Sequence, residues 1–267
     1  MSIRKMEAPI KEVLPINYVL VSVFDKTGLD KVVATLMEVN PDVKFVSTGG
    51  TGKKIQELLG EDYKRNYVSV EELSSTPEME GGLVKTLTPD VHARDLGERA
   101  NPAHQDYLNT LKYLQSLEPI LEFMEQEGVT VDQVREYIQG MVENTPDIGF
   151  FDLSIVSLYP AKEKAEQYHR GEISFEEFRG FIDIGGPTML RAAAKNSPNC
   201  AIICHHNQYG EVLEEIREKG GVSFETRKKL AQDVFALTSE YDSHILSVFR
   251  EEDMGKIKEC YNFEGGE

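Results

Sequence analysis

The chain has 267 residues, of which 40% are hydrophobic, and its formal net charge is -17 at pH 7. This length and apolar content predict one globular domain over residues 1–267 with a sizeable core. The negative charge excludes a general nucleic-acid-binding surface, because such surfaces need clustered Lys and Arg. We find neither an apolar leader nor a run long enough for a membrane span, and therefore expect a cytoplasmic protein that does not bind membranes.

Strand and helix patterns alternate along most of the chain. Apolar runs predict buried strands at residues 18–23, 43–46, 153–158, 181–184 and 201–204. Helical periodicity follows several of these runs, often after a glycine-rich turn. This alternation predicts an α/β fold in which a mostly parallel sheet carries helices on both faces and binds ligands at the carboxyl ends of its strands.

Residues 98–146 interrupt this alternation, because they lack a strong strand signal. Leucines recur there at helical spacing, and Thr130 with Gln133 forms a capping-box pattern before a second helix. We expect an inserted helical hairpin whose leucines pack in a core or an interface. Residues 224–249 predict one or two amphipathic helices, and residues 251–267 predict a polar C-terminal tail.

The most informative segment is residues 182–196, in which a short apolar stretch runs through two glycines into a helix. Glycines let backbone N–H groups approach a ligand closely, and a helix N-terminus favours negative charge. Asp183 precedes the turn, while Arg191 and Lys195 are four residues apart and share a helix face. We expect a carboxylate and two cations to converge on a small-anion site. The alternative is a strand-to-helix turn with solvated charges.

Three further polar clusters accompany the predicted strands, and we expect them at the same edge of the sheet. They are Lys26-Thr27, Thr48-Gly49-Gly50-Thr51 and Lys85-Thr86. The threonine and glycine turn offers backbone N–H groups and hydroxyls to a phosphate, and Lys26 or Lys85 offers a cation. Tyr159, at the end of a predicted strand, either donates a proton or covers the core with its ring.

The three cysteines of the chain indicate reduced thiols rather than a disulfide framework. Cys200, Cys204, His205 and His206 lie close together in the sequence and suggest a metal site. We favour core cysteines and polar histidines at a strand end, because neighbouring strand side chains point to opposite faces and no second ligand pair follows at finger-like spacing.

Taken together, the motifs resemble the IMP cyclohydrolase domain of a bifunctional purine-biosynthesis enzyme that also carries an AICAR transformylase domain. The resemblance rests on segments in the family order, at residues 21–29, 47–51, 77–79, 84–87, 158–160, 182–196 and 235–242. It implies a three-layer fold related to methylglyoxal synthase, a homodimer, and a reaction that uses neither a cofactor nor a metal.

The reaction implied by this resemblance is the ring closure of the ribonucleotide FAICAR to IMP with loss of water. The carboxamide nitrogen attacks the formyl carbon, so groups must manage the amide proton, stabilise an oxyanion and protonate the departing hydroxyl. The resemblance assigns catalysis to Lys85, Tyr159, Asp183 and Lys195. It assigns substrate binding to Asp25, Lys26, Thr27, Thr48, Gly49, Gly50, Thr51, Thr86, Ser157, Ile184, Gly185 and Gly186.

Five positions depart from the family pattern, several of them by losing a polar group: Phe24, Thr76, Leu83, Thr88 and Ser157. Loss of a buried charged contact costs about 2 kcal/mol or more, which is enough to weaken substrate binding strongly. Two alternatives therefore stay open. One is a non-catalytic sensor of purine nucleotides or phosphate, and the other is a methylglyoxal-synthase-like lyase acting on a triose phosphate.

The chain ends where the transformylase domain of the family begins. We therefore expect formyl transfer to be carried out by a separate AICAR formyltransferase, which would supply FAICAR by diffusion or in a complex.

Overall fold

The computed structural model describes residue 6 and residues 9–74, 86–124, 129–144, 147–251 and 253–262. Its centre is a five-stranded parallel sheet in the order β4-β3-β2-β5-β6. The strands are β2 (Tyr18–Ser22), β3 (Lys44–Ser47), β4 (Tyr67–Ser69), β5 (Leu153–Val156) and β6 (Ala201–Ile203). A separate antiparallel ribbon pairs β1 (Val13–Leu14) with β7 (Val222–Ser223). The predicted α/β fold with a mostly parallel sheet is confirmed.

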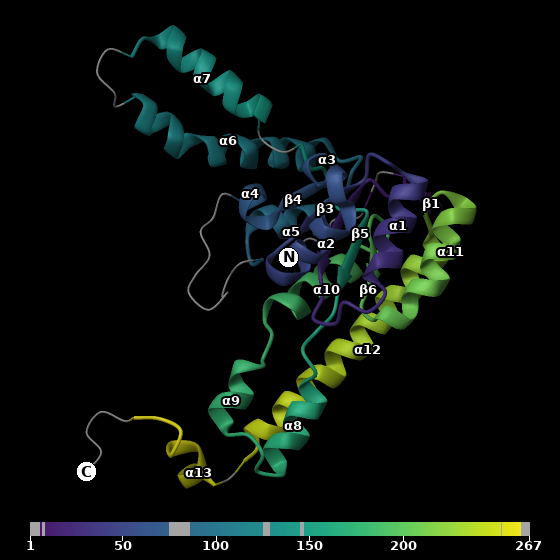
Figure 1. Cartoon of the computed structure of the whole chain (residues 1–267), viewed down its shortest axis with the longest axis vertical. Helices are drawn as coiled ribbons and strands as arrows, with labels where there is room; N and C mark the ends of the chain where they lie inside the picture. Colours follow the sequence, from purple (N-terminus) through teal and green to yellow (C-terminus); the bar gives the residue numbers. More distant parts are fainter. Residues whose placement is uncertain are drawn as a thin grey trace.

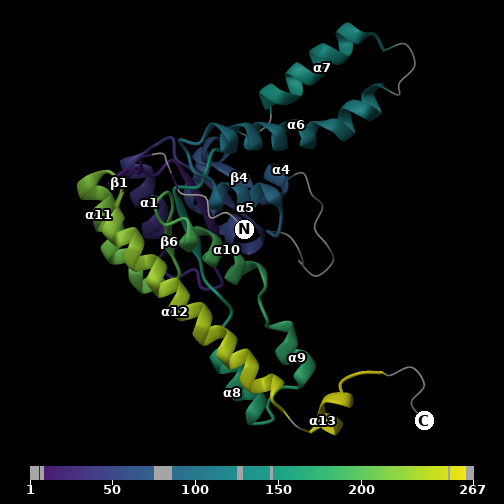
Figure 2. The same cartoon turned by 180° about the vertical axis from the view of Figure 1, so that it is seen from behind.

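Helices cover both faces of the sheet, which explains why its central strands are apolar throughout. Val19, Leu20 and Val21 of β2 are fully buried. On one face, α1 (Leu29–Val39) packs against α2 (Gly49–Leu59) and α11 (Tyr209–Lys219). On the other face, α10 (Gly185–Lys195) packs against α5 (Pro89–Leu96) and α12 (Phe224–Phe249) (Figures 1 and 2). The result is the predicted three-layer arrangement.

Strand β2 occupies the switch point of the sheet. It pairs with β3 on one side and with β5 on the other, with Val21 opposite Ser47 and Ile155. The chain leaves β2 toward α1 on one face, whereas the connection from β5 leads to α10 on the opposite face. Diverging connections of this kind open a crevice at the carboxyl ends of the two strands, where ligands bind in open α/β sheets.

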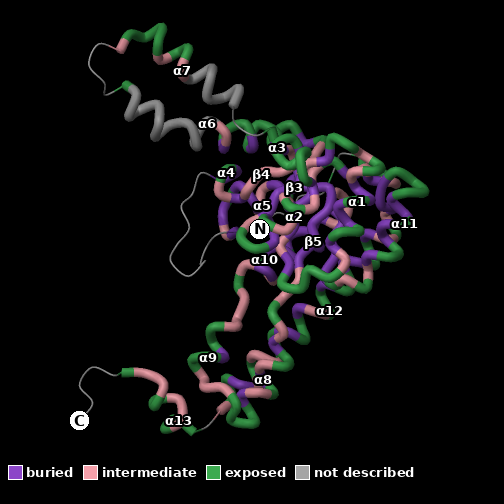
Figure 3. Tube along the Cα trace, in the orientation of Figure 1, coloured by how far each residue is buried: buried purple, intermediate pink, exposed green. Residues whose placement is uncertain are grey.

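Two groups of helices project from the sheet (Figures 1 and 2). One is the predicted hairpin, made of α6 (Pro102–Met124) and α7 (Val131–Asn144), which pack against each other. The other combines the outer half of α12 with α8 (Ala161–His169), α9 (Phe175–Gly180) and the short α13 (Met254–Lys258). Buried residues concentrate around the sheet (Figure 3). The remaining short helices are η1 (Gly60–Asp62), α3 (Tyr63–Asn66), α4 (Val70–Ser74) and η3 (His206–Gln208).

The strand predictions missed β4 and the short β1–β7 ribbon, and they were wrong for residues 181–184. Residues 181–184 form a turn instead of a strand, and the N–H group of Asp183 bonds to the Tyr241 hydroxyl instead of a neighbouring strand. Strand β4 was not predicted, because it is a short edge strand whose three residues are all half-buried and include one polar residue. Within the described part of the chain, no helix is long and apolar enough to span a membrane.

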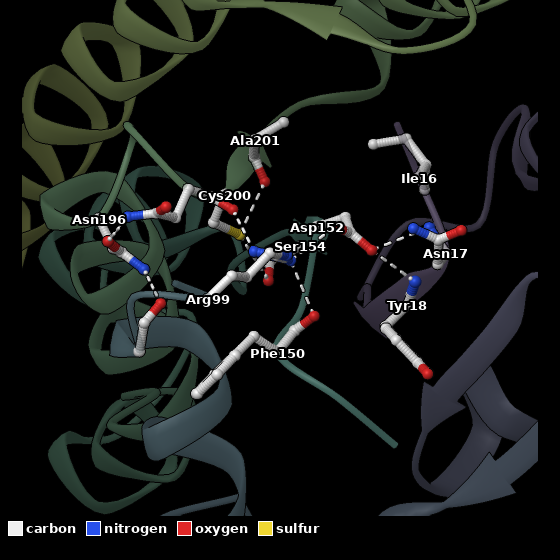
Figure 4. A network of polar contacts seen from close by, with 12 residues as sticks. Ile16, Asn17, Tyr18, Arg99, Phe150, Asp152, Ser154, Asn196, Cys200 and Ala201 are labelled. Atoms are coloured by element: carbon white, nitrogen blue, oxygen red, sulfur yellow. Dashed lines mark hydrogen bonds and ion pairs between the residues drawn. The ribbon is translucent and has the colours of Figure 1, made fainter. Parts of the chain in front are cut away.

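A polar network ties the amino ends of the strands together (Figure 4). Asp152 Oδ2 accepts the N–H groups of Asn17 and Tyr18 at 2.8 and 2.9 Å. Its other oxygen pairs with Arg99 at 2.5 Å. Arg99 also donates to the carbonyl oxygens of Phe150 and Asn199, both at 2.8 Å. The network fixes the start of the hairpin to the sheet at the edge away from the strands' carboxyl ends.

Candidate functional site

Most of the predicted site residues lie on loops at the carboxyl ends of β2, β3 and β5. Strand β2 leads into Asp25, Lys26 and Thr27, and β3 leads directly into the glycine-rich start of α2. Strand β5 leads into Ser157 and Tyr159. The structure therefore brings these sequence-predicted turns to one edge of the sheet, as parallel pairing requires.

The two loops that flank the crevice between β2 and β5 contact each other. Phe24 donates its N–H to Ser157 Oγ at 2.8 Å, and the Phe24 ring lies 5.0 Å from that of Tyr159 at 53°. Both rings remain open to solvent, with Phe24 52% and Tyr159 42% exposed. They line a cavity of about 420 Å³ that also involves Asp25, Ser157 and residues of the β6 end and α12. This cavity accommodates a planar ring of a small ligand.

The N-terminus of α2 forms the second part of the site. Gly49 adopts a left-handed φ of 54°, and a Cβ placed on Gly50 would lie 3.9 Å from Lys26 Cε. Lys26 Nζ donates to the Phe24 carbonyl at 3.3 Å, which holds its charge beside this turn. Backbone N–H groups at a helix start attract anions, and the neighbouring ammonium strengthens that attraction. This arrangement suits a phosphate group.

The two threonines of this turn are already bonded within the protein. Thr51 Oγ1 donates to the Val23 carbonyl at 2.9 Å and accepts the Val23 N–H at 3.3 Å. Thr48 Oγ1 donates to Glu71 Oε1 at 2.9 Å. Both hydroxyl groups thus have partners within the protein, and we expect the backbone N–H groups of this turn to be its main phosphate ligands. Glu71 was missed, since nothing in the sequence links it to Thr48.

Asp183 lies just before α10 in a tightly packed turn. Its Oδ1 accepts the N–H of Gly186 at 2.9 Å. A Cβ on Gly186 would come within 2.2 Å of Asp183 Oδ2, and one on Gly185 within 2.6 Å of Thr86 Oγ1. Close approach, rather than a positive φ, therefore requires these glycines. Burial raises the pKa of Asp183, against the opposing effect of the hydrogen bonds from Gly186 and Gly185.

Lys195 is separated from Asp183 in this structure. It is the last residue of α10, and the helix rises about 15 Å from its first residue to this one. Arg191 lies between them and pairs with Asp242 at 3.5 Å. The expectation that the carboxylate and both cations converge is therefore wrong within one chain. Side chains that share a helix face point in the same direction, but they can lie far apart along the helix axis.

Some predicted residues lie outside the described part of the chain, and they include Lys85, Thr76 and Leu83. Thr86 is described and is buried beside the start of α10. Thr88 caps α5 by accepting the N–H of Val91 at 3.4 Å, which gives this departure from the family pattern a local structural role.

The cysteines and histidines near β6 lie as expected, with the cysteines in the core and the histidines at the end of the strand. Cys200 and Cys204 are buried free thiols. His205 caps the turn after β6 by accepting the N–H of Asn207 at 3.1 Å. Across the described residues, no group of three or more His, Cys, Asp or Glu side chains is placed to hold a metal ion.

One histidine contact lies at the site and was not predicted. His206 Nδ1 lies 3.2 Å from Asp25 Oδ2. Hydrogen bonds from Thr27 chiefly, and then the nearby His206 and His205, hold the pKa of Asp25 below its usual value. The β6 loop is thereby linked to the loop that carries Lys26.

Comparison with known proteins places the chain among its relatives. The family model described as the AICARFT/IMPCHase bienzyme matches residues 193–266. The chain is 39% identical over 226 residues to the bifunctional purine biosynthesis protein PurH of Clostridium beijerinckii, covering 85% of this chain and 36% of that protein. It is 35% identical over 238 residues to PurH of Clostridium botulinum, covering 89% of this chain and 38% of that protein.

A solved structure described as the crystal structure of ForH has the same fold, with a TM-score of 0.55 and 23% identity over 88% of this chain and 98% of that one. The chain spans a little over a third of the length of the PurH proteins that it matches. The chain is thus similar over most of its length to one part of the bifunctional PurH proteins, and its last residues match the AICARFT/IMPCHase family model.

Proposed function

We propose that this chain acts in purine biosynthesis as an IMP cyclohydrolase, which closes the second ring of FAICAR to give IMP. The observation that carries the proposal is the presence, at one sheet edge, of the glycine-rich start of α2, whose backbone N–H groups suit an anion, and of the half-buried carboxylate of Asp183. The PurH relatives support a purine-biosynthesis reaction, while the choice between the two activities in the family description rests on this site.

The proposed substrate spans the two parts of the site. Its phosphate binds the N–H groups at Gly49 and Gly50 beside Lys26, and its ring lies along the crevice near Ser157 and Tyr159. Holding the carboxamide against the formyl group accounts for much of the acceleration, because the reaction is intramolecular.

Asp183 is proposed to take part in moving the amide proton. Its raised pKa suits this role, because a carboxyl group whose pKa lies nearer to neutral pH is a more effective base. The Tyr159 hydroxyl is the proposed donor to the departing hydroxyl group. Tyr159 is exposed at the crevice, where a substrate can reach it.

The role proposed for Lys195 requires a second copy of the chain, because Lys195 lies at the far end of α10 from Asp183. Ile184, Thr188, Arg191 and Lys195 form the exposed face of this helix. In a homodimer whose two-fold axis passes beside the middle of α10 and perpendicular to it, the two copies of α10 lie side by side and run antiparallel. Lys195 of each copy then lies next to Ile184 of the other, which is 62% exposed and directly follows Asp183.

The test is IMP formation from FAICAR by the purified chain, measured against the uncatalysed reaction. We expect catalysis by the wild-type chain and a loss of at least about a hundredfold in Asp183→Asn, the range typical of a general base. Asp132→Asn is the matched control, since Asp132 is exposed on α7, away from the site, and pairs with Arg135 at 3.4 Å. IMP binding without turnover would instead favour the nucleotide sensor, which the Phe24 and Tyr159 ring contact over the crevice also fits.

A further inference from the structure

Tyr241 of α12 reaches the candidate base from a distant part of the sequence. Its hydroxyl oxygen accepts the backbone N–H of Asp183 at 2.7 Å. Tyr241 is only 4% exposed, so its ring is fixed by packing, and it also lines the cavity beside Tyr159. A buried hydrogen bond of this length between two elements restricts the position of both.

This contact replaces the strand pairing that residues 181–184 lack. Without Tyr241, the N–H of Asp183 would lose the partner that the structure gives it beside the cavity. On the opposite side, the Asp183 carboxylate accepts the N–H of Gly186 from the start of α10. Asp183 is thus held between α10 and α12, with its backbone bonded to one helix and its side chain to the other.

The protonation state of the Tyr241 hydroxyl is compatible with a constant hydrogen bond to Asp183. Burial chiefly, and then the charges of Asp183 and Asp242, raise the pKa of Tyr241 to about 12, against the opposing effect of the backbone hydrogen bond from Asp183. The hydroxyl therefore stays neutral at the pH at which Asp183 titrates, and the support does not change as the carboxylate gains or loses its proton.

We propose that Tyr241 is a positioning residue for Asp183, which sets the carboxylate against the reacting amide in the proposed ring closure. The inference rests on the proposed function for its kinetic consequence, while the contact itself is independent of the reaction. Tyr241 acts through Asp183 and not through the phosphate, because the anion-binding turn at α2 belongs to another loop.

The first experiment compares Tyr241→Phe with the wild-type chain. Phe keeps the buried ring and removes only the hydroxyl, so we expect kcat for FAICAR to fall about tenfold, as loss of one buried hydrogen bond predicts. KM should change less than about twofold, because ground-state binding through the phosphate is retained. Tyr168→Phe is the matched control, since Tyr168 is also buried and its hydroxyl bonds to Glu251 at 3.3 Å in the α8 projection.

A double-mutant cycle separates positioning from a general structural effect. In the Asp183→Asn background, Tyr241→Phe should lower the residual rate by less than about twofold, because its target has already been removed. An equal loss in both backgrounds would overturn the inference. So would an unchanged kcat in Tyr241→Phe when the wild-type chain is active.

Amide hydrogen exchange tests the contact without any substrate. The Asp183 N–H should exchange slowly in the wild-type chain and at least about tenfold faster in Tyr241→Phe, with no change in Tyr168→Phe. Rapid exchange in the wild type would overturn the inference, even if the variant does not fold. If the wild type forms no IMP but the protected N–H depends on Tyr241, the proposed function fails while the positioning contact stands.

Discussion

At the residue scale, the buried carboxyl group of Asp95 on α5 has a strongly raised pKa. It is fully buried, Ser154 donates to its Oδ1 at 2.6 Å, and its Oδ2 has no hydrogen-bond partner among the described residues. Burial raises the pKa of Asp95 from 3.8 to about 7, with the Ser154 bond opposing the shift. The folded state therefore favours the protonated acid.

The consequence is a loss of stability as the pH rises. Between pH 3.8 and about 7 the unfolded chain has released this proton while the folded chain keeps it. The contribution of Asp95 to the free energy of unfolding is thus fully present below pH 3.8. It is lost as the pH rises to about 7, by up to about 1.4 kcal/mol per pH unit. We expect Asp95→Asn to flatten this part of the pH dependence and to be more stable than the wild type at pH 8.

Urea unfolding at several pH values measures this effect, because the difference between variant and wild type cancels the other titrating groups. Asp42→Asn, a change at an exposed position, is the control and should leave the pH dependence unchanged. The same slope in wild type and Asp95→Asn would contradict the expected protonation of Asp95.

Some residues of the site could be found in the sequence and others could not. Asp183 and the glycines were found because they form one local pattern of turn and helix start. Tyr241 and Glu71 contact site residues that lie far away in the chain: Tyr241 is 58 residues from Asp183, and Glu71 is 23 residues from Thr48. No local periodicity reports such contacts, since they arise only from the packing of whole helices.

At the scale of elements, the start of α2 and the loop before α1 act together. Lys26 Nζ is held by the Phe24 carbonyl beside Gly50. We expect Lys26→Ala to weaken IMP binding about tenfold, the effect of losing one charge-assisted contact, with little change in kcat. Titration calorimetry with IMP at two salt concentrations checks this.

A second lysine variant is the control for this prediction. Lys31→Ala removes an exposed charge from the following helix and should leave the affinity within about twofold, because a solvated charge contributes little. Equal losses in the two variants would mean that general charge, and not the α2 turn, attracts the phosphate.

Helices and strands with a strong hydrophobic pattern in the sequence were predicted well, and segments whose conformation depends on tertiary contacts were not. The central strands and α12 follow from long apolar or amphipathic runs. Residues 181–184 have a strand-like composition, yet they lie between α9 and α10 and bond to a tyrosine hydroxyl. Tertiary packing overrode local preference there.

At the scale of the whole molecule, the distance between Asp183 and Lys195 makes a prediction about assembly. If each site uses Lys195 of the second copy, inactive Asp183→Asn and inactive Lys195→Ala chains should restore activity when mixed. A mixed dimer has one site with both defects and one intact site, so equal mixing should return about a quarter of the wild-type activity.

The mixing experiment needs exchange of subunits, followed by the same IMP assay. Mixing Lys195→Ala with Lys195→Met chains is the control, which should restore nothing. Absence of recovery in dimers shown to have exchanged would mean that Lys195 does not act across the interface.

The order in which the strands enter the sheet has a consequence for synthesis of the chain. Strand β2 pairs with β3 soon after both are made, but its other partner, β5, follows only after the whole α6 and α7 hairpin. Until then, the apolar edge of β2 has no strand beside it, and such edges invite pairing with other chains. The nascent protein therefore passes through a stage in which its future central strand is an aggregation-prone edge.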